Sequence, residues 1–415
     1  MNNEDKDLKI AFVTGLTLGH KTDSSWRIAD KYIIRALQKH CGEVYPVGPI
    51  SLRGEVLVGK VLNKASQILL KRRFPYHDTS YISKRYARIA AQRLARLSVD
   101  VIIASSCATE IAFLETDIPI VLIEGATFAQ LHNYYPQYSN LLNRSAHEGN
   151  MLHELALKKA SLILVASGWA AQSVIEDYQI EQQKVYVLPY GANIDNPPPL
   201  GAIQKKKKSD RCRLLFVGTD WQRKGGNIAF EILVKLEEMG IQAELVVCGC
   251  VPPSSFAHER MTVIPFLDTS DARQYRELEN LFMTADFFLL PTRQELFGFV
   301  FSEASAYGLP IITTNTGGVS GAVRDGENGF MLPLSAGGSE YAEVIAKAYQ
   351  DNQRYAEMVR ACRVAFDERL NWDSWVITAN KLITEMLEGK KVSQEGDAII
   401  RMPKITARND YPGSF

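Results

Sequence analysis

Short apolar runs alternate along the chain with longer stretches whose apolar positions recur every three or four residues. The runs predict buried strands, and the stretches predict helices that cover a sheet. The predicted strands are 8–14, 101–105, 118–124, 162–166, 185–189, 213–217, 243–248, 261–264, 287–290 and 311–313. Helical patterns lie between them, for example at 25–39, 86–97, 152–160 and 299–307. This alternation predicts a mainly parallel sheet in each half of the chain.

The composition changes abruptly between the two halves. Residues 196–210 are rich in proline and lysine, which predicts a linker between a first domain, 1–195, and a second domain, 211–366. With 415 residues, 46% hydrophobic and 23% charged, the chain is long enough for two globular domains. One more helix is predicted at 372–387. The tail, 388–415, has little apolar periodicity and is predicted to be partly disordered.

Two glutamates flank the start of a predicted helix in the second half. Glu295 lies in the loop after strand 287–290, and Glu303 lies about one turn inside the helix that follows. Loops at the carboxyl ends of parallel strands form ligand sites, and the free N–H groups of a helix start bind anions. Carboxylates accept hydrogen bonds from vicinal hydroxyls, as in sugars and riboses. The alternative is that both glutamates are solvated helix-end charges.

The motifs around these glutamates have a recognisable spacing. The run Glu295-Leu-Phe-Gly-Phe-Val-Phe-Ser-Glu303 is followed by Thr316-Gly-Gly and by Asn328-Gly. Upstream, Leu-Leu-Phe-Val-Gly218 precedes Arg223-Lys224-Gly-Gly. Together these motifs resemble the retaining glycosyltransferases of family four. The resemblance covers nearly the whole chain and implies the GT-B fold, in which two doubly wound Rossmann-like α/β domains face each other across a cleft and helix 372–387 packs back onto the first domain.

The same resemblance implies a role for individual residues. The catalytic candidates are Arg223 and Lys224, which would stabilise the leaving diphosphate, and Glu295, which would bind hydroxyls of the transferred sugar. Glu303 would bind the ribose of a UDP- or GDP-linked donor. The other donor-binding candidates are Gly15, Gly218, Phe266, Leu267, Phe297, Gly298, Phe299 and Val300.

The chain departs from the family pattern at one place in the first domain. Many members carry a histidine directly after the strand that corresponds to 118–123. This chain has Glu124-Gly-Ala-Thr-Phe there, a variant typical of a bacterial subgroup, and its nearest histidine, His132, follows later. His132 is either functional or a packed histidine. The candidates for the acceptor or sugar side are Gly125, Ala126, Thr127 and His132.

Neither a cofactor nor a metal ion is expected. No Asp-x-Asp motif is placed to hold a divalent ion, and the six cysteines lack the spacing of a zinc site. The apolar runs are too short to span a bilayer, and the N-terminus has no signal-peptide pattern. We therefore expect a cytoplasmic, metal-independent enzyme. Retention of configuration follows from the resemblance alone.

Charge is balanced over the chain, with 47 basic and 47 acidic residues, but it is uneven along it. Between residues 53 and 97, eleven basic residues stand against Glu55 and Asp78. On a helical projection Lys60, Lys64 and Lys71 share one stripe. Aliphatic residues form another stripe, at Val58, Val61, Leu62, Ala65 and Leu69. The stretch either contacts the anionic surface at the inner face of the cell membrane, or is an ordinary packing helix with solvated lysines.

The sequence thus predicts a hexosyltransferase that uses a nucleotide-sugar in the synthesis of a glycolipid, an exopolysaccharide or a cell-surface glycan. A soluble disaccharide or glycoside synthase of the same fold is one alternative. A catalytically silent nucleotide-sugar-binding protein is another, although the presence of Glu295, Glu303, Arg223 and Lys224 argues against it. No nucleic-acid partner is expected.

Overall fold

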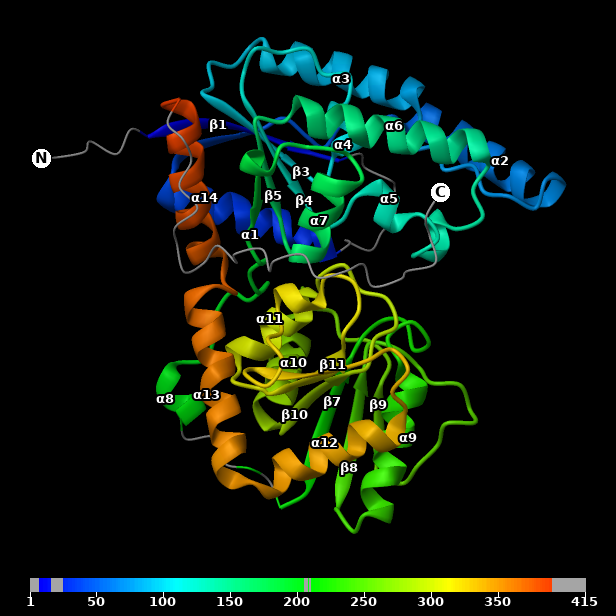
Figure 1. Cartoon of the computed structure of the whole chain (residues 1–415), viewed down its shortest axis with the longest axis vertical. Helices are drawn as coiled ribbons and strands as arrows, with labels where there is room; N and C mark the ends of the chain where they lie inside the picture. Colours follow the sequence, from blue (N-terminus) through cyan, green and yellow to red (C-terminus); the bar gives the residue numbers. More distant parts are fainter. Residues whose placement is uncertain (1–6, 16–24, 205–207, 209, 390–415) are drawn as a thin grey trace, which may run out of the picture. The chain divides into compact units, whose positions relative to one another are not determined.

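The computed structural model describes residues 7–15, 25–204, 208 and 210–389. The chain divides into two compact units (Figure 1), the first made of Met1–Pro189 with Trp372–Phe415 and the second of Tyr190–Asn371. Most of the predicted tail, from residue 390, and residues 205–207 and 209 of the predicted linker lie outside the described residues. Short helix α8, Leu200–Gln204, lies within that linker stretch and belongs to the second unit.

The first unit is a six-stranded parallel sheet in the order β2-β1-β3-β4-β5-β6. Its strands are β1 Leu8–Thr14, β2 Gly42–Pro46, β3 Val101–Ser105, β4 Ile120–Glu124, β5 Leu162–Val165 and β6 Val185–Val187. Its helices are α1 Ser25–His40, α2 Arg53–Leu69, α3 Ser80–Leu94, α4 Ala108–Ile111, α5 Phe128–Leu131, α6 Asn143–Lys159, α7 Gly168–Glu176 and α14 Trp372–Leu387. Every residue of β3, β4 and β5 is buried, as expected when helices cover both faces of a parallel sheet.

The second unit has the same architecture, with strand order β12-β11-β10-β7-β8-β9. Its strands are β7 Cys212–Val217, β8 Ala243–Cys248, β9 Met261–Ile264, β10 Phe287–Leu290, β11 Ile311–Thr314 and β12 Gly329–Leu332. Besides α8, its helices are α9 Gly226–Glu238, α10 Ala272–Thr284, α11 Phe299–Ala306, α12 Gly338–Gln350 and α13 Asn352–Glu368. The prediction of two doubly wound α/β halves is confirmed.

The last described helix, α14, belongs to the first unit although the second unit precedes it in the chain. Asp373 at its start accepts hydrogen bonds from Lys39 at 2.6 Å and from His40 at 2.9 Å, both at the end of α1. On its buried side, the indole N–H of Trp375 donates to the carbonyl of Leu188. Trp375 is therefore a packing residue that ties α14 to the end of the first unit's sheet.

Two strands were missed by the sequence pattern, and both lie at the end of a sheet. Strand β2 has the sequence Gly-Glu-Val-Tyr-Pro and is only partly buried, so it lacks the apolar run by which the other strands were found. Strand β12 begins at Gly329 directly after a turn and also has only two fully buried positions. Edge strands are covered less completely than central ones, and their sequences carry a weaker signal.

Candidate functional site

The second unit reverses the direction of strand addition between β7 and β10. Strands β8 and β9 follow β7 on one side, whereas β10, β11 and β12 lie on the other. Strands β7 and β10 pair in parallel, so the loops after them leave the same edge of the sheet. Ligands of doubly wound sheets bind at such a switch point. The three catalytic candidates lie in these two loops, Arg223 and Lys224 after β7 and Glu295 after β10.

Two glycines bring the loops together. Gly225, the N-cap of α9, has φ of 78°, and a Cβ atom there would lie 2.0 Å from the carbonyl oxygen of Pro291. Gly298, the N-cap of α11, has φ of 84°, and a Cβ atom there would lie 2.6 Å from the ring of Phe301. Only glycine adopts these conformations without strain. The contact at Gly225 places the neighbouring Lys224 against the loop that carries Glu295.

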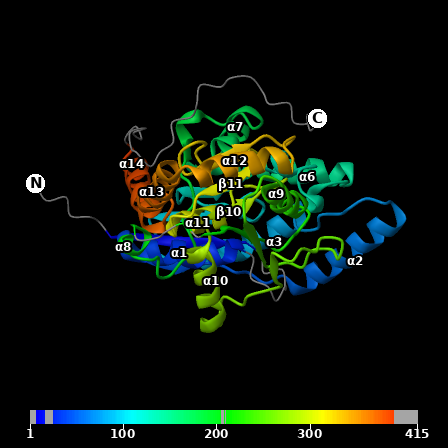
Figure 2. The same ribbon diagram turned by 90° about the horizontal axis from the view of Figure 1, so that it is seen from below.

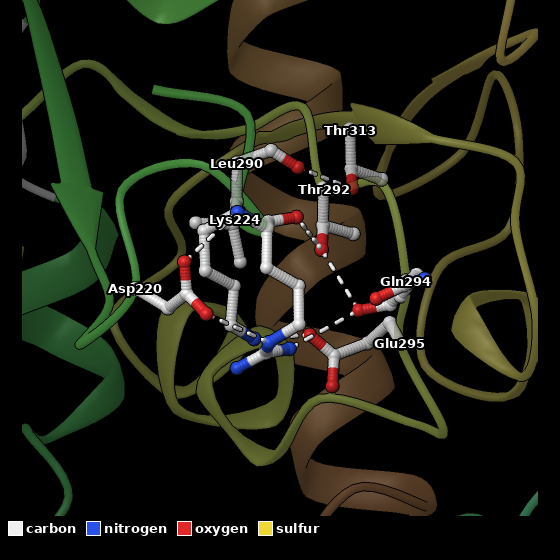
Figure 3. A network of polar contacts seen from close by, with 8 residues as sticks. Asp220, Lys224, Leu290, Thr292, Gln294, Glu295 and Thr313 are labelled. Atoms are coloured by element: carbon white, nitrogen blue, oxygen red, sulfur yellow. Dashed lines mark hydrogen bonds and ion pairs between the residues drawn. The ribbon is translucent and has the colours of Figure 1, made fainter. Parts of the chain in front are cut away.

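An ion pair joins the two loops (Figure 3). The ammonium group of Lys224 donates to a carboxylate oxygen of Glu295, and the two side chains are only 12% and 10% exposed. Arg223 lies beside the pair: its guanidinium donates to the carbonyl of Gln294 at 3.2 Å and lies 3.6 Å from the carboxylate of Asp220. The three catalytic candidates therefore form one cluster at the switch point.

Backbone hydrogen bonds fix the cluster in place. The N–H of Arg293 donates to the carbonyl of Arg223 at 2.8 Å, which links the β10 loop to the β7 loop. The N–H of Gly318, in the loop after β11, donates to the carbonyl of Glu295 at 3.1 Å. The buried hydroxyl of Thr292 donates to the carbonyl of Gln294 at 3.1 Å. Sequence reasoning missed Thr292, because a threonine that supports a loop through the backbone has no sequence signature of its own.

Glu303 lies on α11 and is held separately from the ion pair. It accepts a hydrogen bond from the backbone N–H of Asn193, and burial raises its pKa to about 7. The same segment packs on α11 through Tyr190, whose ring stacks on Phe299 with 5.5 Å between centroids. The hydroxyl of Ser302 donates to the carbonyl of Tyr190 at 2.9 Å. Residues 190–193, which fall within the predicted first domain 1–195, belong to the second unit.

The remaining donor-side candidates lie along the same edge of the sheet at different distances from the ion pair. Gly218 directly follows β7, and a Cβ atom there would lie 3.0 Å from the Lys224 side chain. Phe297 is buried against Tyr190, and Val300 is half-buried at the start of α11. Phe266, which is 63% exposed, and Leu267 follow β9, two strands away from β7.

The first unit has a switch point of its own, between β1 and β3. Gly15 follows β1, and a Cβ atom there would lie 3.1 Å from a carboxylate oxygen of Glu110 in α4. Glu124 ends β4, which pairs with β3; it is buried and accepts a hydrogen bond from the N–H of Ala108. Burial and the charge of Glu110 raise the pKa of Glu124 to about 8. Glu110 was missed, although its place just after a buried strand is the signal that pointed to Glu295.

The other first-unit candidates lie around α5. Gly125 and Ala126 are buried, and Thr127 caps α5 by accepting from the N–H of Gln130. The Thr127 hydroxyl also lies 2.6 Å from that of Ser173, so its role in the structure is to hold α5 in place. His132 follows α5 and lines a cavity of about 460 Å³, and burial lowers its pKa. The cavity lining is His132, Leu141, Asn143, Ala146, His147 and Asn150.

The described part of the chain has neither a cluster of metal ligands nor a membrane-spanning helix. No three His, Cys, Asp or Glu side chains gather there as metal ligands would. In the same residues no helix is both long and apolar enough to cross a membrane. The cysteines are all free thiols in the described structure, and all but Cys250 are buried.

Comparison with solved structures shows which class of fold this is. Sucrose-phosphate synthase of Thermosynechococcus elongatus aligns with a TM-score of 0.63 at 15% identity, over 92% of this chain and 100% of that one. Anabaena HepE in complex with UDP-glucose aligns with a TM-score of 0.58 at 15% identity, over 92% and 100%. The chain has the two-domain, Rossmann-like GT-B fold, as predicted.

Sequence comparison finds a family match within the second unit. Residues 202–364 match the family model "Glycosyl transferases group 1". The D-inositol 3-phosphate glycosyltransferase of Acidothermus cellulolyticus is 29% identical over 230 residues, 51% of this chain and 51% of that protein. The chain thus spans about half the length of the curated relatives it matches. The matched family segment contains the whole Arg223, Lys224 and Glu295 cluster.

Proposed function

We propose that the protein is a glycosyltransferase that takes a hexose from a UDP- or GDP-linked donor. The observation that carries the proposal is the buried Lys224–Glu295 pair at the β7–β10 switch point, inside the segment that matches the glycosyl transferase family. A cation for a diphosphate and a carboxylate for sugar hydroxyls lie side by side there. The pair can therefore bind both the diphosphate and the sugar of a nucleotide-sugar.

The leaving diphosphate is stabilised by fixed positive charge. Arg223 and Lys224 are held by the loop contacts before a ligand binds, so they need little reorganisation when negative charge develops on the phosphates. The N-terminus of α11, after Gly298, adds free N–H groups on the same edge of the sheet. Loss of one preorganised group of this kind costs roughly 3 kcal/mol of transition-state stabilisation.

Lys224 and Glu295 exchange their partners when the donor binds. Without a ligand, Glu295 is the anionic partner of Lys224. A donor diphosphate offers Lys224 a second anion, and the Glu295 oxygens then become available to accept hydrogen bonds from hydroxyls of the sugar. Glu295 acts in this scheme as a positioning and stabilising group. The transfer retains configuration, with the leaving diphosphate taking the acceptor proton, and needs no metal ion.

Glu303 binds the ribose hydroxyls of the donor, and the base lies toward Phe266 and Leu267 at the end of β9. Support for this comes from the position of Glu303 on α11, the helix whose start lies beside the catalytic loops. The HepE structure, which was solved with UDP-glucose, has the same fold. A uridine diphosphate donor is therefore the first to test.

The acceptor is bound by the first unit. The cavity beside His132 has a volume of about 460 Å³, and its lining includes two amides and two imidazoles, which suit the hydroxyl groups of a sugar or polyol, beside the apolar Leu141 and Ala146. We place the enzyme in the cytoplasm, acting in glycolipid, exopolysaccharide or cell-surface glycan synthesis. A soluble glycoside synthase is the second candidate, supported by the structural likeness to sucrose-phosphate synthase, with a TM-score of 0.63.

A thermal-shift screen with UDP- and GDP-sugars tests the donor assignment. A donor at a hundred times its dissociation constant stabilises the protein by about 2.7 kcal/mol, or about 5–10 °C for a domain of this size. Hydrolysis or transfer of the same donor then tests catalysis. Glu295→Gln should abolish turnover, whereas Glu238→Gln, at the exposed Lys235–Glu238 pair, serves as the matched control. Donor binding without any turnover by the wild type would identify the silent-binding alternative.

A further inference from the structure

Helix α2 exposes a continuous aliphatic surface. Seven large apolar side chains in and just after this helix are each more than half exposed, namely Leu57, Val58, Val61, Leu62, Ile68, Leu69 and Leu70. They are half of the large apolar side chains that are exposed in the described chain. Exposed aliphatic groups gathered in this way mark an interaction surface. We call these seven residues the α2 apolar face.

The helix packs on the first unit through its other side. Only three of its residues are buried, Val56, Gly59 and Ser66, and the last two are small. Gly59 lies so close to Tyr76 that a Cβ atom would be 2.4 Å from the ring. At 3.6 residues per turn, the apolar face within α2 covers an arc of about 140° opposite these residues. The helix therefore packs through its small side, and its aliphatic side is the one turned outward.

Positive charge borders the apolar face. Lys60 and Lys64 lie on the helix between the apolar face and the buried side, and Lys71 follows at its end. All three side chains are exposed, and none forms an ion pair with an acidic group of the described chain. Arg72 at the same end donates to the neutral side chain of Asn143. The border of the apolar face is therefore cationic and uncompensated.

We propose that the α2 apolar face docks on an anionic lipid bilayer. An aliphatic stripe with lysines along its border is the pattern of a helix that lies in the membrane interface, with its apolar side in the acyl region and its cations at the headgroups. The helix lies at the margin of the first unit in both views (Figure 1, Figure 2). This proposal is independent of which sugar or acceptor the enzyme uses.

Charge decides against two other occupants. Residues 390–415 contain five lysines and arginines and three acidic residues, so this tail is itself cationic. A second copy of the chain would bring an identical set of lysines to the same border. Like charges at an interface oppose association, whereas anionic lipid headgroups complement them.

Vesicle co-sedimentation of the full chain tests the proposal. The protein should bind vesicles of phosphatidylcholine with phosphatidylglycerol and leave pure phosphatidylcholine vesicles in the supernatant. Lys60→Gln with Lys64→Gln should weaken binding about 30-fold, since each cation near the surface contributes about 1 kcal/mol and 1.4 kcal/mol is tenfold. Val61→Ser with Leu69→Ser should weaken it at least tenfold, because less apolar surface leaves water.

A matched control comes from α14, which also carries an exposed aliphatic residue and an exposed lysine one turn apart. Ile377→Ser with Lys381→Glu should bind vesicles like the wild type. All variants should keep the wild-type melting temperature and the same donor-induced thermal shift, which separates this proposal from the proposed function.

Several results would overturn the proposal: no vesicle binding, equal binding to neutral vesicles, or wild-type binding by both α2 variants. Sedimentation velocity without lipid provides a further check. A dimer that Val61→Ser with Leu69→Ser dissociates would identify a second copy as the occupant. Vesicle binding that arises only after removal of residues 390–415 would identify the tail.

Discussion

The Lys224–Glu295 pair makes a quantitative prediction about the second unit. Both side chains are almost buried, and each is the other's ionic partner. Removal of one member of a buried pair takes the ionic partner from a charge in a low-dielectric site, which costs 3–5 kcal/mol, whereas removal of both costs far less. Because about a tenth of each side chain is exposed, we take the lower end, about 3 kcal/mol, for Lys224→Met.

A double-mutant cycle measures this coupling. Lys224→Met should lower the free energy of unfolding by about 3 kcal/mol, which corresponds to about 6–12 °C in melting temperature. The double variant Lys224→Met with Glu295→Leu should recover most of this loss, so the coupling energy should be roughly 2 kcal/mol or more. Urea titration with calorimetry provides both quantities. At the exposed Lys235–Glu238 pair, Lys235→Met should cost less than about 1 kcal/mol.

The cycle also separates stability from catalysis. The double variant should be folded and nearly as stable as the wild type, yet inactive, because the diphosphate loses its cation and the sugar its carboxylate. If Lys224→Met costs no more than Lys235→Met, or if the two single losses simply add, the pair is not the buried, coupled contact described above. A low activity of Lys224→Ala alone would prove little, since that variant also leaves Glu295 without its partner.

Four further predictions concern Gly225, Glu303, Glu124 and divalent ions. Gly225→Ala should destabilise the second unit by more than about 1 kcal/mol and abolish donor-induced thermal shifts, because its Cβ atom meets the Pro291 carbonyl. Donor binding measured by calorimetry should strengthen as pH rises through about 7, the pKa of Glu303, since the ionised carboxylate is the better acceptor; Glu303→Gln should flatten the profile. Burial raises the pKa of Glu124 to about 8, so its protonated form stabilises the fold. This contribution is complete below about pH 4.5 and is lost as pH rises through about 8. Glu124→Gln should therefore raise the melting temperature at pH 9 relative to the wild type but not at pH 5. Chelation of divalent ions should leave turnover unchanged, and a strict requirement for manganese would refute the metal-free proposal.

The sequence predicted the central strands of both sheets, because central strands of a parallel sheet are apolar throughout. Strands β3 and β8 were found with their exact limits, whereas the partly exposed edge strand β2 was missed. The sequence also indicated Lys224 and Glu295 as site residues, but not that they form an ion pair. That pairing joins residues 71 positions apart and depends on the approach of Gly225 to Pro291, which no local pattern encodes.

Helix α2 shows what an amphipathic sequence pattern leaves open. Its amphipathic pattern was evident from the sequence, but a pattern alone does not say which side of a helix is packed. The natural expectation is that the aliphatic side faces the core. Here Gly59 permits a close contact with Tyr76, and Ser66 donates to the carbonyl of Arg72, so a small and polar side suffices for packing. The aliphatic side is thereby left outside.

Glu124 lies at the end of β4 in the first unit, where the structure buries it beside Glu110. With a pKa of about 8, its carboxyl group is mainly protonated at pH 7, and a protonated carboxyl, like a neutral imidazole, both donates and accepts a hydrogen bond. The two switch points therefore differ in charge: Arg223 and Lys224 lie at that of the second unit, whereas Glu110 and Glu124 lie near that of the first. This difference suits the proposed binding of a diphosphate donor by the second unit and of a hydroxyl acceptor by the first.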